Sequence, residues 1–201
     1  MSDTERKADM KLTKAEVAAR QLDTAIKLFF NAGDIVSVHT LAAASATVFA
    51  DILEQTGETS WRQQIVEEHS DLTKSHVYNI LRSAQNFFKH ADLDPEESLE
   101  FSDTYNDAMI FIATLECGLL LQSKNQKRKA REKLSTPMSV FQLWNIATKP
   151  DDFYMPEAIV AAANALFPEI NERPRFEQLS IGASVLRKRE AYKRRPPPSQ
   201  I

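Results

Sequence analysis

Glycine and cysteine are both scarce in this sequence of 201 residues, which contains four glycines and one cysteine. So few glycines exclude a glycine-rich phosphate loop, a β-sandwich built on tight turns and a collagen-like repeat. The single cysteine, Cys117, cannot form an internal disulfide, and the polar first residues do not resemble a secretory signal. These absences lead us to expect a cytoplasmic protein.

Long apolar runs are also missing. In the most apolar segment, residues 103–121, the uncharged run extends only from Ala108 to Leu115 before Glu116 interrupts it. A bilayer needs about 20 apolar residues, so we predict a core helix here and no membrane partner. The composition, 43% hydrophobic and 26% charged, is typical of a globular chain, and one of this length buries roughly 70% of its extended surface.

Motifs that start helices recur along the chain. Thr13 with Glu16, and Ser60 with Gln63, have the spacing of a capping box, and Thr73 is a further candidate cap. Proline is favoured in the first turn of a helix, and it predicts three later starts near Pro137, Pro156 and Pro174.

Apolar residues recur at helical spacing between these motifs, and no segment shows sustained period-two alternation. We therefore predict an all-α helical bundle without a β-sheet. Gly33 suits the left-handed position that ends the first helix, and Gly57 ends the second. Their short connection makes these helices an antiparallel pair over residues 13–56. The pair is expected to pack on the helix that begins at Asp103, because the three apolar stripes match.

The predicted organisation has four parts along the chain: a flexible N-terminus, a helical bundle, a helical C-terminal extension and a disordered tail. They cover residues 1–12, 13–123, 124–195 and 196–201. Charge is unevenly distributed among them. Residues 90–123 contain eight acids and no lysine or arginine, whereas residues 124–133 and 187–195 each contain six bases and one acid.

The two basic segments form a candidate nucleic-acid surface, with the residues Lys127, Arg128, Lys129, Arg131, Arg187, Lys188, Arg189, Arg194 and Arg195. Clustered cations bind phosphate groups with strong salt dependence, so weak RNA or DNA binding is one interpretation. The other is that they are solvated helix ends, where cations are favoured. The net charge of −3 does not favour a dedicated nucleic-acid-binding protein.

The segment from Asn86 to Asp92 is the densest group of reactive side chains. Asn86 and His90 are four residues apart and share a helix face, with Lys89 and Asp92 beside it. His90 is a candidate general base that Asp92 could orient, and Asn86 and Lys89 could hold a phosphate or an oxyanion. Alternatively, the segment is a helix C-terminus at which Lys89 and His90 interact with the helix dipole.

A second histidine, His39, follows Asp34 at the start of the second predicted helix. One hypothesis is that His39, Asn86, Lys89 and His90 border one polar pocket. The other is that Asp34 caps the helix and His39 makes a partly buried hydrogen bond.

Metal binding is not indicated. There is no His-Glu-x-x-His motif, Glu-x-x-His pair or cysteine cluster, and a predicted helix break separates His69 from His76. Cys117 lies within the apolar helix with no identifiable activating group, so we expect an inert core residue.

Two motifs resemble the signatures of a family of uncharacterised bacterial helical proteins. The first is Gly-Asp-Ile-Val-Ser-Val-His-Thr-Leu-Ala-Ala at residues 33–43, and the second is Asn-Phe-Phe-Lys-His-Ala-Asp at residues 86–92. The resemblance covers residues 12–120 and implies no particular activity. At the level of fold, the hairpin and the later Asn/Lys/His segment are similar to HEPN domains, which are small helical bundles and often dimeric.

Many HEPN domains are metal-independent ribonucleases. Their motif is an arginine followed by a histidine, with four to six residues between the two. Here seven residues separate Arg82 from His90, and the better-spaced Arg62 and His69 lie between the two signature regions. These departures favour a non-catalytic binding or interaction module in an RNA-related, toxin–antitoxin or defence setting, with Asp34, His39, Arg82 and Asp92 as binding residues. The alternative is a metal-independent ribonuclease or nucleotide-handling enzyme that uses His90. The resemblance implies no cofactor, and a homodimer or protein partner fits it.

Overall fold

The computed structural model describes residues 10–69, 73–90, 92, 95–123, 133–152 and 155–193. These residues form eight α-helices and one short 3₁₀-helix: α1 (Lys14–Phe30), α2 (Ile35–Gln55), α3 (Trp61–Glu68), α4 (Lys74–Lys89), α5 (Tyr105–Gln122), α6 (Thr136–Thr148), α7 (Glu157–Leu166), η1 (Ile170–Glu172) and α8 (Arg175–Lys193). No strand occurs in these ranges, so the predicted all-α class is confirmed.

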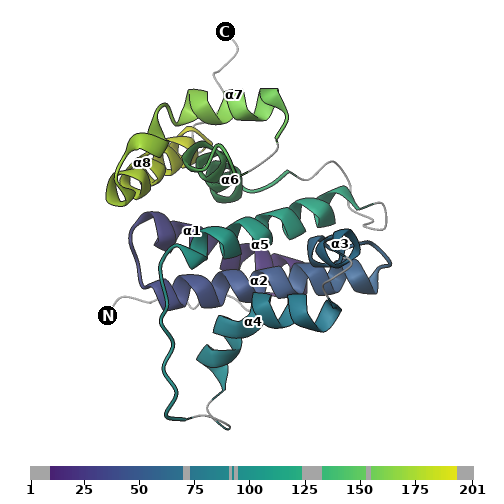
Figure 1. The fold of residues 1–201 in the computed structure, drawn as a ribbon. Helices are drawn as coiled ribbons and strands as arrows, with labels where there is room; N and C mark the ends of the chain where they lie inside the picture. Colours follow the sequence, from purple (N-terminus) through teal and green to yellow (C-terminus); the bar gives the residue numbers. More distant parts are fainter. Residues whose placement is uncertain are drawn as a thin grey trace, which may run out of the picture.

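Helix α2 is the centre of the bundle. It packs along α1 and α5, and α4 packs against it as well (Figure 1). Four buried alanines on α2 allow these close approaches: Ala42, Ala43, Ala46 and Ala50. The predicted packing of the first two helices against the helix near Asp103 is therefore confirmed.

By length and composition alone, α2 is also apolar enough to cross a membrane. This is weak evidence for a membrane span, because the core helix of a helical bundle passes the same test. In this structure α2 packs against three other helices.

The caps confirm most of the predicted helix ends. Both capping boxes form, at Thr13 and at Ser60, and the Thr73 side chain accepts from the amide of His76. The second helix ends before Gly57 as predicted, and Gly57 adopts a left-handed conformation with φ +78°.

The prediction for Gly33 is wrong, because the left-handed residue is Ala32, with φ 51°. The chain already turns at Ala32, and the amide of Gly33 then donates to the carbonyl of Leu28 at 2.8 Å. Space at position 33 is nevertheless tight, since a Cβ there would lie 3.1 Å from that same oxygen.

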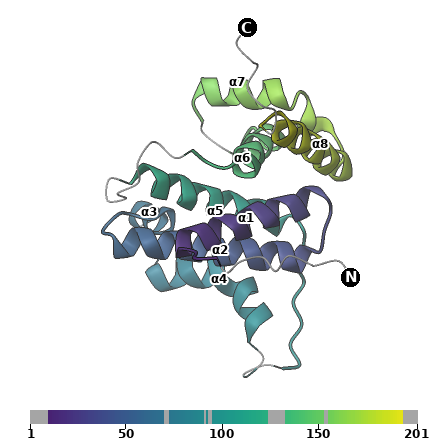
Figure 2. The ribbon, with the colours of Figure 1, turned by 180° about the vertical axis from the view of Figure 1, so that it is seen from behind.

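The C-terminal helices α6 and α8 pack against α1, and α7 lies on the outer side of α6 (Figure 2). Four aromatic rings join α6 to α1, with centroids 5.3–6.1 Å apart: Phe29, Phe30, Phe141 and Trp144. The indole N–H of Trp144 also donates to the carbonyl of Gln178 on α8 at 2.9 Å. This aromatic cluster holds the C-terminal helices to the bundle.

Gly182 of α8 packs directly on this cluster. A Cβ at position 182 would lie 2.3 Å from Cε1 of Phe30, whose side chain is buried. Alanine is the better helix former by about 1 kcal/mol. We nevertheless expect Gly182→Ala to lower the free energy of unfolding by about 1–3 kcal/mol, because the added methyl group would have to displace a buried ring that packs against three others.

Urea denaturation measures this effect against a matched control, Gly118→Ala on α5. Nothing lies within 4 Å of a Cβ at position 118, so this control should be stabilising by about 0.5–1 kcal/mol. Equal stabilisation by both substitutions would show that α8 does not pack on Phe30 in this way.

Candidate functional site

His39 lies near the start of α2 and is 4% exposed. Its Nδ1 atom is 3.1 Å from Oδ1 of Asn106 on α5, and Nδ2 of the same asparagine donates to the carbonyl of Ile35 at 3.0 Å. The bond to Ile35 assigns the orientation of the amide, so Asn106 Oδ1 accepts from His39. Nδ1 of His39 therefore carries the proton, and in the neutral ring Nε2 is an acceptor.

The Nε2 atom of His39 is buried and has no hydrogen-bond partner among the described residues. Burial lowers the pKa of His39 and outweighs the hydrogen bond to Asn106, which alone would raise it. The ring is therefore neutral at neutral pH, with the lone pair of Nε2 unused. A buried acceptor without a donor typically costs about 1–3 kcal/mol.

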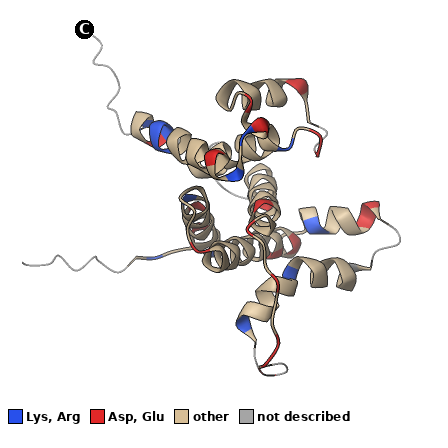
Figure 3. Cartoon of the chain, turned by 60° about the vertical axis from the view of Figure 1, so that its left-hand side comes forward, with Lys and Arg blue, Asp and Glu red and all other residues tan. Residues whose placement is uncertain are grey.

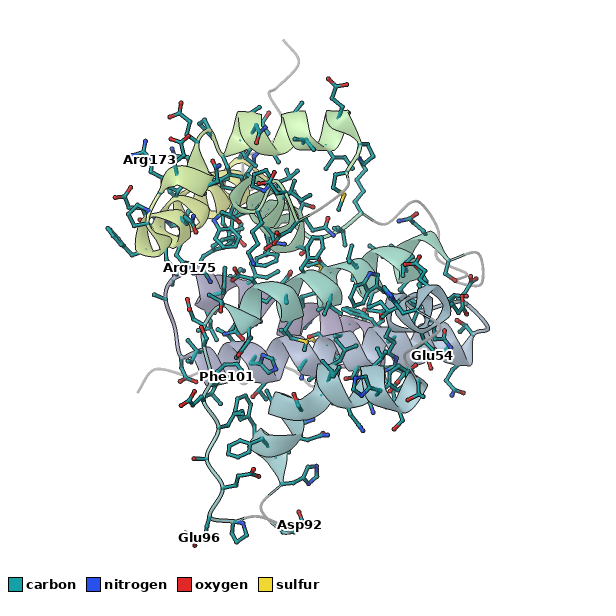
Figure 4. All side chains as sticks on the ribbon, in the orientation of Figure 1. Glu54, Asp92, Glu96, Phe101, Arg173 and Arg175 are labelled. Atoms are coloured by element: carbon teal, nitrogen blue, oxygen red, sulfur yellow. The ribbon has the colours of Figure 1, made fainter. Side chains whose placement is uncertain are left out.

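Two aromatic rings pack against His39. Phe88 of α4 and Phe101 of the segment that leads into α5 meet it edge to face, at centroid distances of 5.8 and 5.0 Å. The two phenylalanines also contact each other, at 5.2 Å. We call residues 95–104 the strap; Figure 4 shows Phe101 where the strap reaches the bundle. These contacts hold the imidazole between α2, α4 and the strap.

A cavity of about 400 Å³ lies beside His39, between α4, α5 and the strap. We call it the His39 cavity. Its walls are mainly apolar and include Ile80, Leu81, Ala84, Leu99, Met109 and Ile112. The wall residues Ile80, Leu99 and Tyr105 are 59%, 42% and 56% exposed, so the cavity has an apolar rim. Its size and lining are typical of a small-molecule site.

The lowered pKa of His39 predicts a loss of stability in acid. Unfolding returns His39 to its ordinary pKa near 6.5, so the unfolded chain binds a proton that the folded protein rejects. The contribution of His39 to the free energy of unfolding is thus complete above pH 6.5. It is lost as the pH falls toward the pKa of His39 in the folded protein. We expect the wild type to lose more free energy of unfolding between pH 7.5 and 5.5 than His39→Gln.

Urea denaturation at the two pH values measures this difference. Asp23 and Glu116, whose pKa values are raised by burial, act in the opposite direction in both proteins, so they cancel in the comparison. Equal losses in the two proteins would exclude His39 as the source.

The structure does not bring the predicted pocket residues together. Asn86, Lys89 and His90 are exposed at the C-terminal end of α4, and none of them lines the His39 cavity. Phe88 points inward to His39, and residues two positions away are rotated by about 200° around a helix. Asn86 and His90 therefore face away from the cavity.

The end of α4 has the geometry of a helix C-terminus, which is the second of the two interpretations above. The amide of His90 donates to the carbonyl of Asn86 at 3.0 Å. The exposed ring of His90 has its Nδ1 3.9 Å from an oxygen of Asp92, at the outer tip in Figure 4. At the start of α2, Asp34 accepts from the amide of Ser37 at 2.7 Å, so it caps the helix. Hydrogen bonds from the side chain and from the amide of Ser37 lower the pKa of Asp34.

A buried ionic network, which sequence reasoning missed, joins α2, α3 and α4. Arg62 is 6% exposed; its Nε donates to Glu54 and its Nη2 to Asp51, both at 2.6 Å. Tyr78 of α4 donates to Glu54 at 2.9 Å. The guanidinium groups of Arg62 and Arg82 both lie over the Tyr78 ring, at 4.6 and 5.6 Å. Both arginines discussed for a HEPN-like motif therefore contact Tyr78, twelve positions before His90.

Glu116 of α5 anchors the same region. Its carboxylate accepts from the backbone amides of Trp61 and Arg62, at 3.1 and 3.2 Å. Glu116 is 1% exposed, and burial raises its pKa despite these bonds. The acid that interrupts the apolar run of α5 thus binds the free amides at the N-terminus of α3.

A second ionic cluster joins α8 to α5. Arg175 makes two bonds to Asp107, at 2.6 and 3.0 Å, and one to Asp103 at 3.1 Å. Lys149, the residue after α6, also reaches Asp107, at 3.0 Å. In Figure 4, Arg175 lies between α8 and the helices beneath it. Asp107 is 1% exposed, so this cluster is part of the packing between the bundle and its C-terminal helices.

The structure describes only part of the predicted basic surface. Arg187, Lys188 and Arg189 are exposed on the last turns of α8. Figure 3 shows blue ribbon at this end of the helix. The other predicted members lie outside the described residues: Lys127, Arg128, Lys129, Arg131, Arg194 and Arg195. Figure 3 also shows acids along the strap.

No group of three or more metal-ligating side chains occurs in the described part of the chain. Cys117 is buried in α5. No family model, curated protein or solved structure matches this chain.

Proposed function

We propose that this protein is a non-catalytic binding module with a HEPN-like helical bundle, and that its ligand occupies the His39 cavity. The observation that carries the proposal is the buried Nε2 of His39, an acceptor without a donor beside an apolar cavity. Buried polar atoms in folded proteins nearly always have partners, so this one calls for an explanation. A ligand with a hydrogen-bond donor provides it.

The partners expected from the sequence stay predictions. A homodimer or protein partner, and an RNA-related, toxin–antitoxin or defence setting, rest on the resemblance to HEPN domains. Weak RNA or DNA binding rests on charge, and the exposed bases of α8 support it: Arg187, Lys188 and Arg189.

The geometry at His90 favours binding over catalysis. A HEPN-like ribonuclease needs a cation beside its histidine to stabilise the charge that develops on phosphate. The described partner of His90 is the carboxylate of Asp92, and Arg62 and Arg82 both contact Tyr78 instead. An acid at this position repels phosphate.

Blocking the cavity tests the proposed site. Ala84→Trp places a large ring in the wall, and Ala161→Trp on the exposed surface of α7 is the matched control. Wild type and both variants are screened by ligand-observed NMR against a library of small neutral aromatic compounds. We expect the library to contain compounds that bind the wild type and the Ala161→Trp variant but do not bind the Ala84→Trp variant. A library without such compounds would overturn the proposal.

Substitution of His90 tests the catalytic alternative. His90 is exposed, so we expect His90→Ala to change the free energy of unfolding by less than about 0.5 kcal/mol. Neither the wild type nor the variant should cleave a mixed-sequence RNA. His39→Ala is the contrasting control, and it should lower the melting temperature by several degrees because His39 is buried and hydrogen-bonded. Cleavage by the wild type that His90→Ala abolishes would establish the ribonuclease instead.

A further inference from the structure

We infer that the ligand of the His39 cavity is a small, neutral, mostly apolar molecule whose single O–H or N–H group donates to Nε2 of His39. This inference rests on the proposed function, because it names the class of ligand for the same cavity. Three properties of the cavity carry it: its walls, its charge and the buried acceptor of His39 that has no donor among the described residues.

The walls determine that most of the ligand is apolar. The helical walls are mainly apolar side chains from α4 and α5, where Ser83 and Tyr105 carry hydroxyl groups, and the strap adds Leu99 and the ring of Phe101. A volume of about 400 Å³ accommodates a molecule with one or two aromatic rings. Apolar atoms of such a ligand gain free energy by leaving water, whereas additional polar groups would lose hydrogen bonds to it.

The charge of the cavity favours a neutral ligand. The pKa of His39 is lowered by burial, so the ring supplies no cation for an anionic ligand. Glu100 is the charged residue of the lining, and it lies exposed on the strap. Its carboxylate repels an anionic ligand. A cationic ligand would lose its hydration against the apolar walls. None of the buried residues of the lining is a carboxylate that could replace this hydration.

His39 determines that the ligand is a donor. The bond between Asn106 and Ile35 assigns the Nδ1 proton, which leaves Nε2 as an acceptor alone. The contacts with Phe88 and Phe101 hold the ring before a ligand arrives, which reduces the entropy lost on binding. Nε2 is itself buried, so a donor of the ligand can reach it only if a side chain that packs over it moves. We expect Phe101 to shift, because it lies on the strap rather than within a helix.

Two pairs of probes test the donor requirement: phenol with anisole, and indole with 1-methylindole. In each pair the second compound has the same ring but no donor. Titrations of the wild type, followed by ¹H–¹⁵N spectra, give the dissociation constants. We expect phenol and indole to bind about five- to tenfold more tightly than their methylated partners, as one added hydrogen bond predicts.

His39→Phe keeps an aromatic ring and removes both nitrogens. In this variant phenol should bind no more tightly than anisole. A direct readout does not depend on the variant folding: the Nε2 resonance in the imidazole ¹⁵N spectrum of the wild type should move upfield when phenol is added. An unchanged Nε2 resonance at saturating phenol would overturn the inference.

The same titrations separate the two proposals. Equal affinity for phenol and anisole, lost in Ala84→Trp but kept in Ala161→Trp, would contradict the donor requirement and leave the cavity as the binding site. If no probe and no compound of the library binds the wild type at the cavity, the proposed function fails, and the inference fails with it.

Discussion

Replacing Arg62 with methionine is expected to lower the free energy of unfolding by about 3 kcal/mol. Methionine fills a similar volume but removes the guanidinium that binds Glu54, whose side chain is 16% exposed. Burial alone would raise the pKa of Glu54, but bonds from Arg62, Ser60 and Tyr78 together hold it below its ordinary value. Removing Arg62 thus leaves a charge in a poorly solvated place.

The neighbouring arginine supplies the control for this prediction. Arg82 also stacks on Tyr78, but it is only half-buried, so Arg82→Met should cost less than about 1 kcal/mol. Urea denaturation measures both variants. Equal costs would show that stacking on Tyr78, and not the pairing of Arg62 with Glu54, stabilises this region.

The Arg62 network also bears on the proposed site. Tyr78 donates to Glu54, and burial together with this bond raises the pKa of Tyr78 to about 12. The tyrosine therefore remains a hydrogen-bond donor throughout the neutral range. Because it connects α4 to α2, it positions the helix whose next turns supply Ile80, Leu81 and Ala84 to the cavity.

Replacing Trp144 with alanine is expected to cost about 3–5 kcal/mol. The Trp144 side chain is 0% exposed, and it contacts the rings of Phe29, Phe30 and Phe141. Truncation would leave a large hole between α1 and α6 and would remove the hydrogen bond from the indole to the carbonyl of Gln178. The guanidinium of Arg175, 5.4 Å from the indole centroid, would lose a stacking partner as well.

Trp61→Ala is the matched control for Trp144→Ala. Trp61 is half-buried, and its bond to Glu116 uses the backbone amide, which alanine retains. We expect this second substitution to cost about 1–2 kcal/mol. Loss of all folded structure in Trp144→Ala, seen by circular dichroism, would show that α1–α5 do not fold without their C-terminal cover. Similar losses of free energy of unfolding in the two variants would contradict the conclusion that the aromatic cluster holds the C-terminal helices to the bundle.

The sequence by itself determined the all-α class and most of the helix starts. The signals for these starts are local. A capping box joins residues three positions apart, as at Thr13 and Ser60, and Pro137 lies in the first turn of α6 as predicted. Such contacts form within one turn, so their residue types and spacing are sufficient. The pairing of α1 with α2 followed from the short connection between them.

Only the tertiary structure decided which of the candidate residues meet. Asn86 and His90 share a face, as their spacing predicts, but the inward position of Phe88 turns that face away from His39. The partner of His39, Asn106, is 67 positions away, and Asp107 is 68 positions from Arg175. No local pattern specifies contacts at such separations, because they depend on how whole helices rotate and pack. For this reason the sequence pointed to His39, whereas the cavity and the unused Nε2 beside it emerged only from the folded chain.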